Sequence, residues 1–207
     1  VHLPLEPAMG RFFGLHGEQP TARLSALHDV MDGQTLHSLI VPAEVDERDC
    51  AHLHLAHLPA NSLTLFDRGY PGHWLFALFE QQQRHFLMRL PRGYNAQVKQ
   101  FLQSGQVEDT QFFAASHPEA RLFCTEAGVD PAAQLKLRLV RVELASGESE
   151  VLVTSLLDRQ AFPVTVFADI YHRRWGIETD YRRLKQTLCL DNFSGRSVVA
   201  VKQDFHA

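Results

Sequence analysis

The chain has 207 residues, of which 45% are hydrophobic and 21% are charged, and its formal net charge is −4. This length suits one ordinary domain or one domain with a large insertion, and the composition excludes a disordered or collagen-like chain. The acidic balance gives no general attraction to phosphate, so any surface that binds nucleic acid must be local.

The first half of the chain predicts a hairpin followed by a helix. Residues 1–20 are rich in Pro and Gly and are expected to form a loop or an edge segment. Two half-alternating runs, near 22–30 and 34–41, flank Asp32-Gly33, a dipeptide that favours a tight type I′ turn between two strands. Pro42 then precedes a segment with acids in its first turn and spaced leucines, which predicts a helix near 43–57.

A strand, a helix and a second strand follow. The run SLTLFDRGY is short, apolar and bounded by turn residues, as in a buried strand, and Asp67 comes at its carboxyl end. PGHWLFALFEQQQ predicts a helix and HFLMRLP predicts another strand. This succession indicates an α/β layer that contains a parallel pair of strands.

The second half of the chain changes in texture. Residues 92–155 are broken and β-rich, and within them 134–144 and 150–156 flank Ser146-Gly147 as in a β-hairpin. Residues 164–188 then predict one long helix.

That last helix has two distinct faces. At about 100° per residue, its apolar side chains form a core-facing stripe within roughly 60°; they are Ile170, Ile177, Tyr181, Leu184 and Leu188. Beside the stripe, a second sector of roughly 60° holds Tyr171, Arg174, Glu178 and Lys185. Spacing alone is typical of a solvated face with ordinary ion pairs. The alternative is a site where the acid holds a hard cation and the bases neutralise phosphate.

These four residues carry a resemblance. They stand in the pattern Y-x2-R-x3-E-x6-K, which resembles the signature of the DDE transposases of bacterial insertion sequences, in the branch grouped around insertion sequence four. LTLFDRGY resembles the family's segment around the second catalytic acid, and the likeness extends over nearly the whole chain.

The resemblance implies an RNase H-like α/β core, incomplete at its amino end, with a β-rich insertion before the last catalytic helix. The core would comprise residues 1–91 and 156–207, and the insertion residues 92–155. Three carboxylates of such a core hold two Mg²⁺ or Mn²⁺ ions, and Asp67 and Glu178 would be two of them. Tyr171, Arg174 and Lys185 would contact the DNA backbone.

The chain differs from the family pattern at the first catalytic acid. The family carries it in an Asp-Gly context just upstream of the segment that resembles residues 3–14, and this chain starts after that point. Asp29 and Asp32, beside the predicted turn, are weak substitutes. We therefore expect a transposase truncated at its amino end, also short of material at its carboxyl end, and inactive by itself.

The predicted function is metal-dependent DNA strand cleavage and strand transfer at the ends of a mobile element. The alternatives are an inactive remnant that at most binds DNA, and a metal-dependent nuclease of the same fold that does not transpose. The expected partners are element ends, target DNA and, for the complete enzyme, a second copy. No segment predicts a membrane span or a signal peptide, which leads us to expect a cytoplasmic protein. The resemblance implies a bacterial, nucleoid-associated location.

Other polar residues predict no further site. His52, His54 and His57 do not share the face that a zinc site on a helix requires. The three cysteines are far apart and fit reduced thiols. A solvated surface position is expected for the basic residues in and before the insertion; they are Arg84, Arg89, Arg92, Lys99, Lys136, Arg138 and Arg141.

Overall fold

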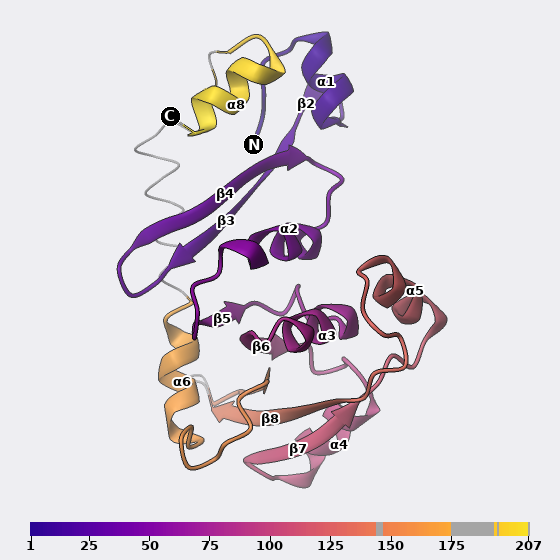
Figure 1. The fold of residues 1–207 in the computed structure, drawn as a ribbon, viewed down its shortest axis with the longest axis vertical. Coiled ribbons are helices and arrows are strands. Elements are labelled where there is room, and N and C mark those ends of the chain that lie inside the picture. The colour runs from indigo at the N-terminus through magenta and orange to yellow at the C-terminus, as the bar shows by residue number, and fades with distance from the viewer. Residues whose placement is uncertain (144–146, 175–192, 194, 207) are drawn as a thin grey trace. The chain divides into compact units, whose positions relative to one another are not determined.

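The computed structural model describes residues 1–143, 147–174, 193 and 195–206. The chain divides into two compact units, shown as ribbons in Figure 1. One unit is made of Val1–Leu58 and Trp175–Ala207, and the other of Pro59–Arg174. Each unit is built around its own strands.

A five-stranded mixed sheet forms the centre of the unit Pro59–Arg174. In spatial order its strands are β5 (Leu63–Phe66), β6 (His85–Leu90), β9 (Ser149–Thr154), β8 (Leu135–Glu143) and β7 (Glu108–Phe113). Strands β5 and β6 are parallel, and all other neighbours are antiparallel. The helices are α3 (His73–Gln81), α4 (Ala96–Ser104), α5 (Pro118–Glu126) and α6 (Thr165–His172). The α/β class is thereby confirmed.

Helix α3 connects the parallel strands β5 and β6, as the sequence predicts. Two parallel strands need such a crossover, because the chain must return to the end of the sheet at which the first strand began before it can start the second. Every side chain from His73 to Phe79 is buried, so the helix is enclosed on all sides. The rings of Phe76 and Phe86 stack with their centroids 5.2 Å apart, which fixes the helix against β6.

The β-rich segment shares its sheet with the strands before it. Strands β8 and β9 form the predicted antiparallel hairpin, and Gly147 takes a φ of +82° beside its turn. Strand β9 also pairs with β6, so the hairpin continues the sheet that begins with β5. A division of the chain into a core and an insertion at 92–155 stays a prediction.

Helix α6 confirms the first part of the predicted long helix. Phe167 is fully buried and Tyr171 is 6% exposed, one turn apart on the face that packs against the sheet. They join a cluster completed by Leu87, Val140, Leu152 and Leu156. The rest of the predicted helix, from residue 175, lies outside the described residues.

The unit Val1–Leu58 with Trp175–Ala207 is built on the hairpin of β3 (Ala22–Asp29) and β4 (Gln34–Pro42). A short hairpin of β1 (Leu15–His16) and β2 (Gln19–Pro20) precedes it. Among the described residues of this unit, the helices are α1 (Pro7–Phe13), α2 (Glu47–His54), η1 (Leu55–His57) and α8 (Val198–His206). The expectation of a loop at the start is wrong for α1. Pro7 opens this helix, and Met9 and Phe13 bury one face of it.

The turn between β3 and β4 also differs from the prediction. Residues 30–33 make the connection, and only Gly33 among them has a positive φ, +67°, whereas a type I′ turn needs two such residues. The Asp29 carboxylate accepts a hydrogen bond of 2.8 Å from the backbone N–H of Met31. This side-chain bond stabilises a longer turn than the dipeptide alone suggests.

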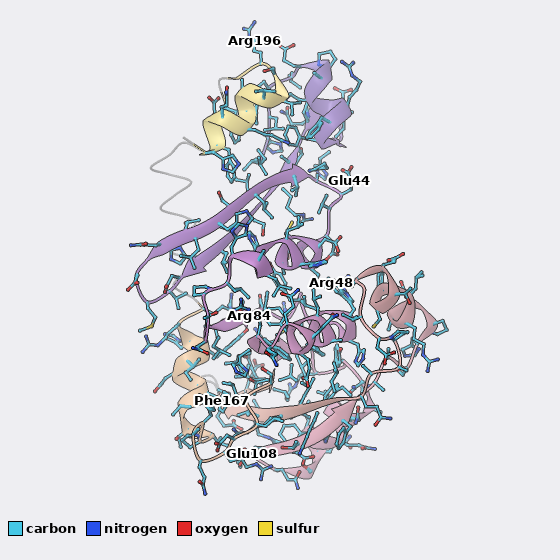
Figure 2. The ribbon with its side chains drawn as sticks, in the orientation of Figure 1. Glu44, Arg48, Arg84, Glu108, Phe167 and Arg196 are labelled. Carbon is cyan, nitrogen blue, oxygen red and sulfur yellow. The ribbon has the colours of Figure 1, made fainter. Side chains whose placement is uncertain are left out.

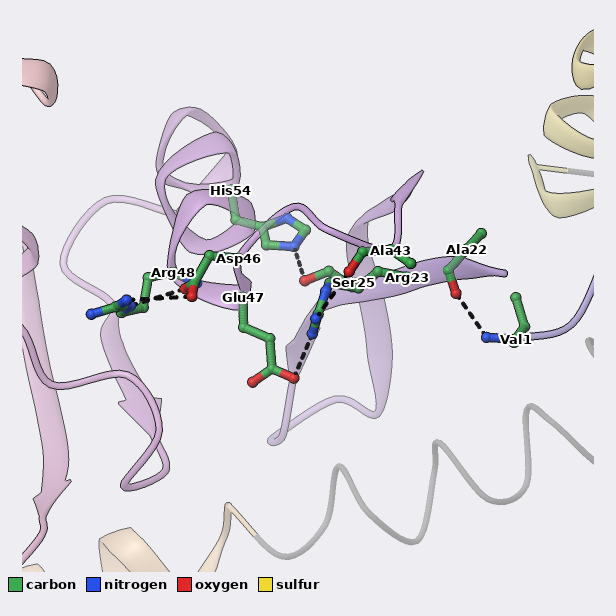
Figure 3. Close-up of polar contacts among 9 residues, drawn as sticks. All are labelled: Val1, Ala22, Arg23, Ser25, Ala43, Asp46, Glu47, Arg48 and His54. Carbon is green, nitrogen blue, oxygen red and sulfur yellow. Dashed lines mark hydrogen bonds and ion pairs between the residues drawn. The ribbon is translucent and has the colours of Figure 1, made fainter. Parts of the chain in front are cut away.

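Helix α2 begins at Glu47, four residues after the predicted start near 43, and η1 completes the predicted range to residue 57. The Asp46 carboxylate caps it by accepting from the Arg48 backbone N–H at 2.8 Å, as Figure 3 shows. In the same view Arg23 of β3 pairs with Glu47 of α2 at 2.9 Å. The pair of Arg23 and Glu47 joins the helix to the hairpin. None of the helices in the described ranges is long and apolar enough to cross a membrane.

Candidate active site

Asp67 directly follows β5, at the carboxyl end of the strand, as predicted. Its side chain is 43% exposed. One oxygen of the Asp67 carboxylate accepts a hydrogen bond from the backbone N–H of Arg68 at 2.7 Å. The backbone carbonyl of Asp67 accepts another from the N–H of Tyr70 at 3.2 Å. The turn after β5 therefore holds the Asp67 carboxylate in place, and the carboxylate stays accessible to solvent.

Arg89 and Glu150 stand beside this acid. Met88 of β6 is the register partner of Phe66, the last residue of β5. The residues that follow these two in the sequence, Arg89 and Asp67, are therefore neighbours. Arg89 Nη1 lies 4.0 Å from Asp67 Oδ1, and Nη2 forms an ion pair with Glu150 of β9. We did not predict these two residues as part of the site. The signal that could have found Arg89 is the parallel pairing itself, which brings the carboxyl ends of both strands to one edge.

Tyr171 joins helix α6 to the same strand end. Its hydroxyl donates to the backbone carbonyl of Phe66 at 3.2 Å, across 105 residues of sequence. Burial raises the pKa of Tyr171 to about 12; the negative charge of Asp67 acts in the same direction, and the positive charge of Arg174 opposes it. The phenol is therefore a neutral hydrogen-bond donor throughout the physiological range.

The expectation of an open polar face is wrong for Tyr171 and Arg174. They are 6% and 8% exposed, and the Arg174 guanidinium carbon lies 5.6 Å from the centre of the Tyr171 ring. Tyr171 is buried because its ring packs between α6 and the sheet, in the same cluster as Phe167 and Leu87. Their predicted contact with DNA stays untested.

Among the residues that it describes, the structure adds no other predicted residue to this site. Glu178 and Lys185 lie outside the described residues. Asp29, the weak substitute for the first acid, uses its carboxylate within the β3–β4 turn, where it accepts from Met31 and, at 3.4 Å, from Asp32. The structure thus brings together Asp67 and the Tyr171 end of α6.

Arg138 of β8 secures the segment that leads into α6. Its side chain is fully buried, which corrects the expectation of a solvated position. Nε donates to Glu108 at 2.7 Å, Nη1 donates to the carbonyl of Phe162 at 2.7 Å, and the guanidinium lies 5.0 Å from the ring centre of Phe167. Glu108 and Phe167 are labelled in Figure 2. A single arginine thereby ties β7, β8 and the start of α6.

The oxygen donor at this site suits a hard divalent cation. Mg²⁺ is commonly held by one or two carboxylates, with water and substrate phosphates completing its coordination. Asp67 supplies one accessible carboxylate of that kind. Within the described part of the chain, no group of three or more His, Cys, Asp or Glu side chains could hold a metal ion by itself. Asp67 therefore fits the role of one ligand among several.

Two comparisons with known proteins show what the chain is similar to. The family described as "Transposase DDE domain" matches residues 13–207. The chain is also similar to the transposase InsG for insertion sequence element IS4 of Escherichia coli (strain K12), with 32% identity over 139 residues. That match covers 66% of this chain and 30% of the relative's length.

Proposed function

The chain belongs to the transposase DDE domain family, and on this premise we propose that it supplies part of an active site that cleaves and joins DNA at the ends of a mobile element. The family suggests DNA transposition, and its members generally use divalent metal ions. The substrate ends, the strand-transfer step and the complete set of ligands are parts of the proposal.

The hydrogen bond from Tyr171 to the carbonyl of Phe66 carries this proposal. It holds α6 at the end of β5, one residue from Asp67. Glu178 follows Tyr171 by seven residues, close to two turns of a helix at 3.6 residues per turn. In the predicted helix, Glu178 therefore shares the face of Tyr171, about 10 Å further along the axis. We propose that Glu178 shares a metal centre with Asp67, and the contact of Tyr171 with the end of β5 supports this.

Carboxylates in this arrangement suit phosphodiester chemistry. Two bound Mg²⁺ or Mn²⁺ ions would activate water or a DNA 3′-hydroxyl and stabilise the departing oxygen. Asp67 is held for this task by the turn after β5, and its exposure leaves it open to an ion and to a phosphate. Arg174 and Lys185 are proposed to hold DNA phosphates. Tyr171, whose hydroxyl contacts Phe66, is better assigned to positioning the helix than to binding DNA.

The wider architecture belongs to the same proposal. We propose an RNase H-like core of residues 1–91 and 156–207, with residues 92–155 as an insertion in it. The five-stranded mixed sheet supports the α/β class of this core. Three of its strands, β7, β8 and β9, lie within residues 92–155, so the proposed insertion shares the sheet with β5 and β6. A homodimer that acts on two element ends in the bacterial cytoplasm completes the proposal.

The test is excision of a marked element in cells that produce the protein carrying this sequence. Asp67→Asn and Glu178→Gln should each reduce excision to the background of cells without transposase, because each removes a charged ligand at nearly constant shape. Glu126→Gln, an exposed position in α5, is the matched control and should excise normally. Normal excision by either site variant would contradict the assignment. DNA nicking without excision by the unaltered protein would favour a nuclease that does not transpose.

A further inference from the structure

Arg89 lies between two carboxylates at the candidate site. One nitrogen of its guanidinium contacts Glu150 and the other faces Asp67 at 4.0 Å. The three side chains come from neighbouring strands, β6, β9 and the end of β5, which belong to the same sheet. Their geometry is therefore fixed by strand pairing.

The two acids differ in their access to solvent. The side chain of Glu150 is 11% exposed, whereas that of Asp67 is 43% exposed, and Arg89 is intermediate at 26%. The closer ion pair is the one with the more buried acid. Glu150 therefore determines where the guanidinium sits, and Asp67 keeps one open side.

We propose that Arg89, held by Glu150, is a built-in competitor of the divalent ion at Asp67. In the metal-free protein its positive charge partly neutralises the Asp67 carboxylate, and it repels an ion that binds there. The inference rests on the proposed function, because it assumes that Asp67 is a metal ligand. Arg89 is accordingly a positioning residue that sets metal affinity through Asp67.

The size of the effect follows from charge and distance. A unit charge and a divalent ion about 6 Å apart interact strongly enough, even at the dielectric constant of water, to change an affinity by roughly tenfold. Because Arg89 and Asp67 are both partly exposed and screened by salt, we expect a change of about threefold to tenfold. The sign is fixed: removal of the guanidinium should tighten binding.

The experiment is titration of the whole chain with Mn²⁺, in which the free ion is measured by electron paramagnetic resonance. Arg89→Met keeps the apolar stem and removes the charge, and Arg89→Gln is a second variant in case the first fails to fold. Both should bind Mn²⁺ about threefold to tenfold more tightly than the unaltered chain. Arg92→Met, an exposed arginine just after β6, is the matched control and should change the affinity less than twofold.

A double-mutant cycle tests the role of Glu150. Glu150→Gln should weaken Mn²⁺ binding in the unaltered chain, because the released guanidinium can pair with Asp67. In the Arg89→Met background the same substitution should have a smaller effect, since no guanidinium is left to release. Equal effects in both backgrounds would overturn the claim that Glu150 acts through Arg89.

Asp67→Asn separates this inference from the proposed function. If Asp67→Asn abolishes Mn²⁺ binding but the Arg89 variants bind no more tightly than Arg92→Met, the competitor role is wrong and the proposed metal site stands. If Asp67→Asn binds Mn²⁺ as well as the unaltered chain, or if neither the unaltered chain nor the Arg89 variants bind it at millimolar concentration, both are wrong. Thermal unfolding of each variant confirms that it is folded.

Discussion

At the scale of single residues, two buried polar side chains tie the elements of the candidate site together. Arg138 joins Glu108 of β7 to the segment before α6, and Tyr171 joins α6 to the end of β5. Polar groups of this kind are costly to bury alone, and both are hydrogen-bonded. The site therefore depends on residues that do not themselves belong to it.

Arg138→Met is expected to destabilise the unit Pro59–Arg174 by about 3–5 kcal/mol, because it breaks a buried ion pair and leaves Glu108 with its more exposed neighbour Arg159. Lys136→Met, at an exposed position of the same strand, is the matched control and should change stability by no more than about 0.5 kcal/mol. Urea unfolding followed by circular dichroism measures both. Equal losses in the two variants would show that the Arg138 pair contributes nothing specific.

Tyr171→Phe should cost about 1 kcal/mol, the usual contribution of one hydrogen bond. The phenol itself can be followed, because its pKa of about 12 lies above that of an ordinary tyrosine. The difference between the alkaline absorbance titrations of the unaltered chain and the variant isolates this group, and its midpoint should fall near 12. A midpoint near the ordinary value of about 10 would mean that the ring is not buried at the strand end.

At the scale of elements, patterns read along the sequence predict most of the local structure. The parallel pair β5 and β6 with its crossover helix, the β8–β9 hairpin and the start of α6 all follow from periodicity and turn residues. The position of Asp67 at the end of β5 is predicted correctly, because it follows as soon as the buried strand before it is recognised in the sequence.

Features that depend on pairing between distant residues could not be predicted in this way. The burial of Arg138 requires that β7 bring Glu108 within hydrogen-bond reach of it, in the register that pairs Thr110 with Arg138. The position of Arg89 requires the register of β5 against β6. The α1 helix was missed because Pro and Gly suggested a loop, although Pro is favoured in the first turn of a helix. Local composition does not show which distant residues Arg138 and Arg89 contact.

The packing of β4 against α2 and η1 gives a prediction about pH. His37 and His54 share a hydrogen bond of 2.8 Å between their Nδ1 atoms, the other ring nitrogen of His54 bonds Ser25 at 3.0 Å, and His57 stacks on His37. One Nδ1 must accept, so this arrangement requires a neutral ring. Burial, followed by the charges of His37 and His57, lowers the pKa of His54 to about 4 from 6.5. The bond from His54 to Ser25 is visible in Figure 3.

Stability of this unit should therefore fall as the pH is lowered from 6.5 towards 4, because the unfolded chain binds a proton that folded His54 does not. The contribution lost is on the order of 2–3 kcal/mol. His54→Gln should flatten the pH dependence of thermal unfolding in this range, whereas His16→Gln, at an exposed position in β1, should leave it unchanged. An unaltered slope in His54→Gln would assign the acid sensitivity to other groups.

At the scale of the whole molecule, the chain passes from one unit to the other at two points, between Leu58 and Pro59 and between Arg174 and Trp175. The second point lies within the helix that the sequence predicts from 164 to 188. Asp67 and Tyr171 precede this second point and Glu178 follows it. We propose that both acids bind the same metal ion. The membership of the chain in the transposase DDE domain family makes this the central claim of the proposed function.

The most direct test of that claim is backbone cleavage by bound Fe²⁺, which with ascorbate and peroxide generates hydroxyl radicals at the metal and cuts the chain near its ligands. We expect cuts near both Asp67 and Glu178, suppressed by excess Mg²⁺, and lost at both places in Asp67→Asn and in Glu178→Gln. Cuts confined to the neighbourhood of one acid, or a cut near Glu178 that survives in Asp67→Asn, would show that the two carboxylates do not share a metal.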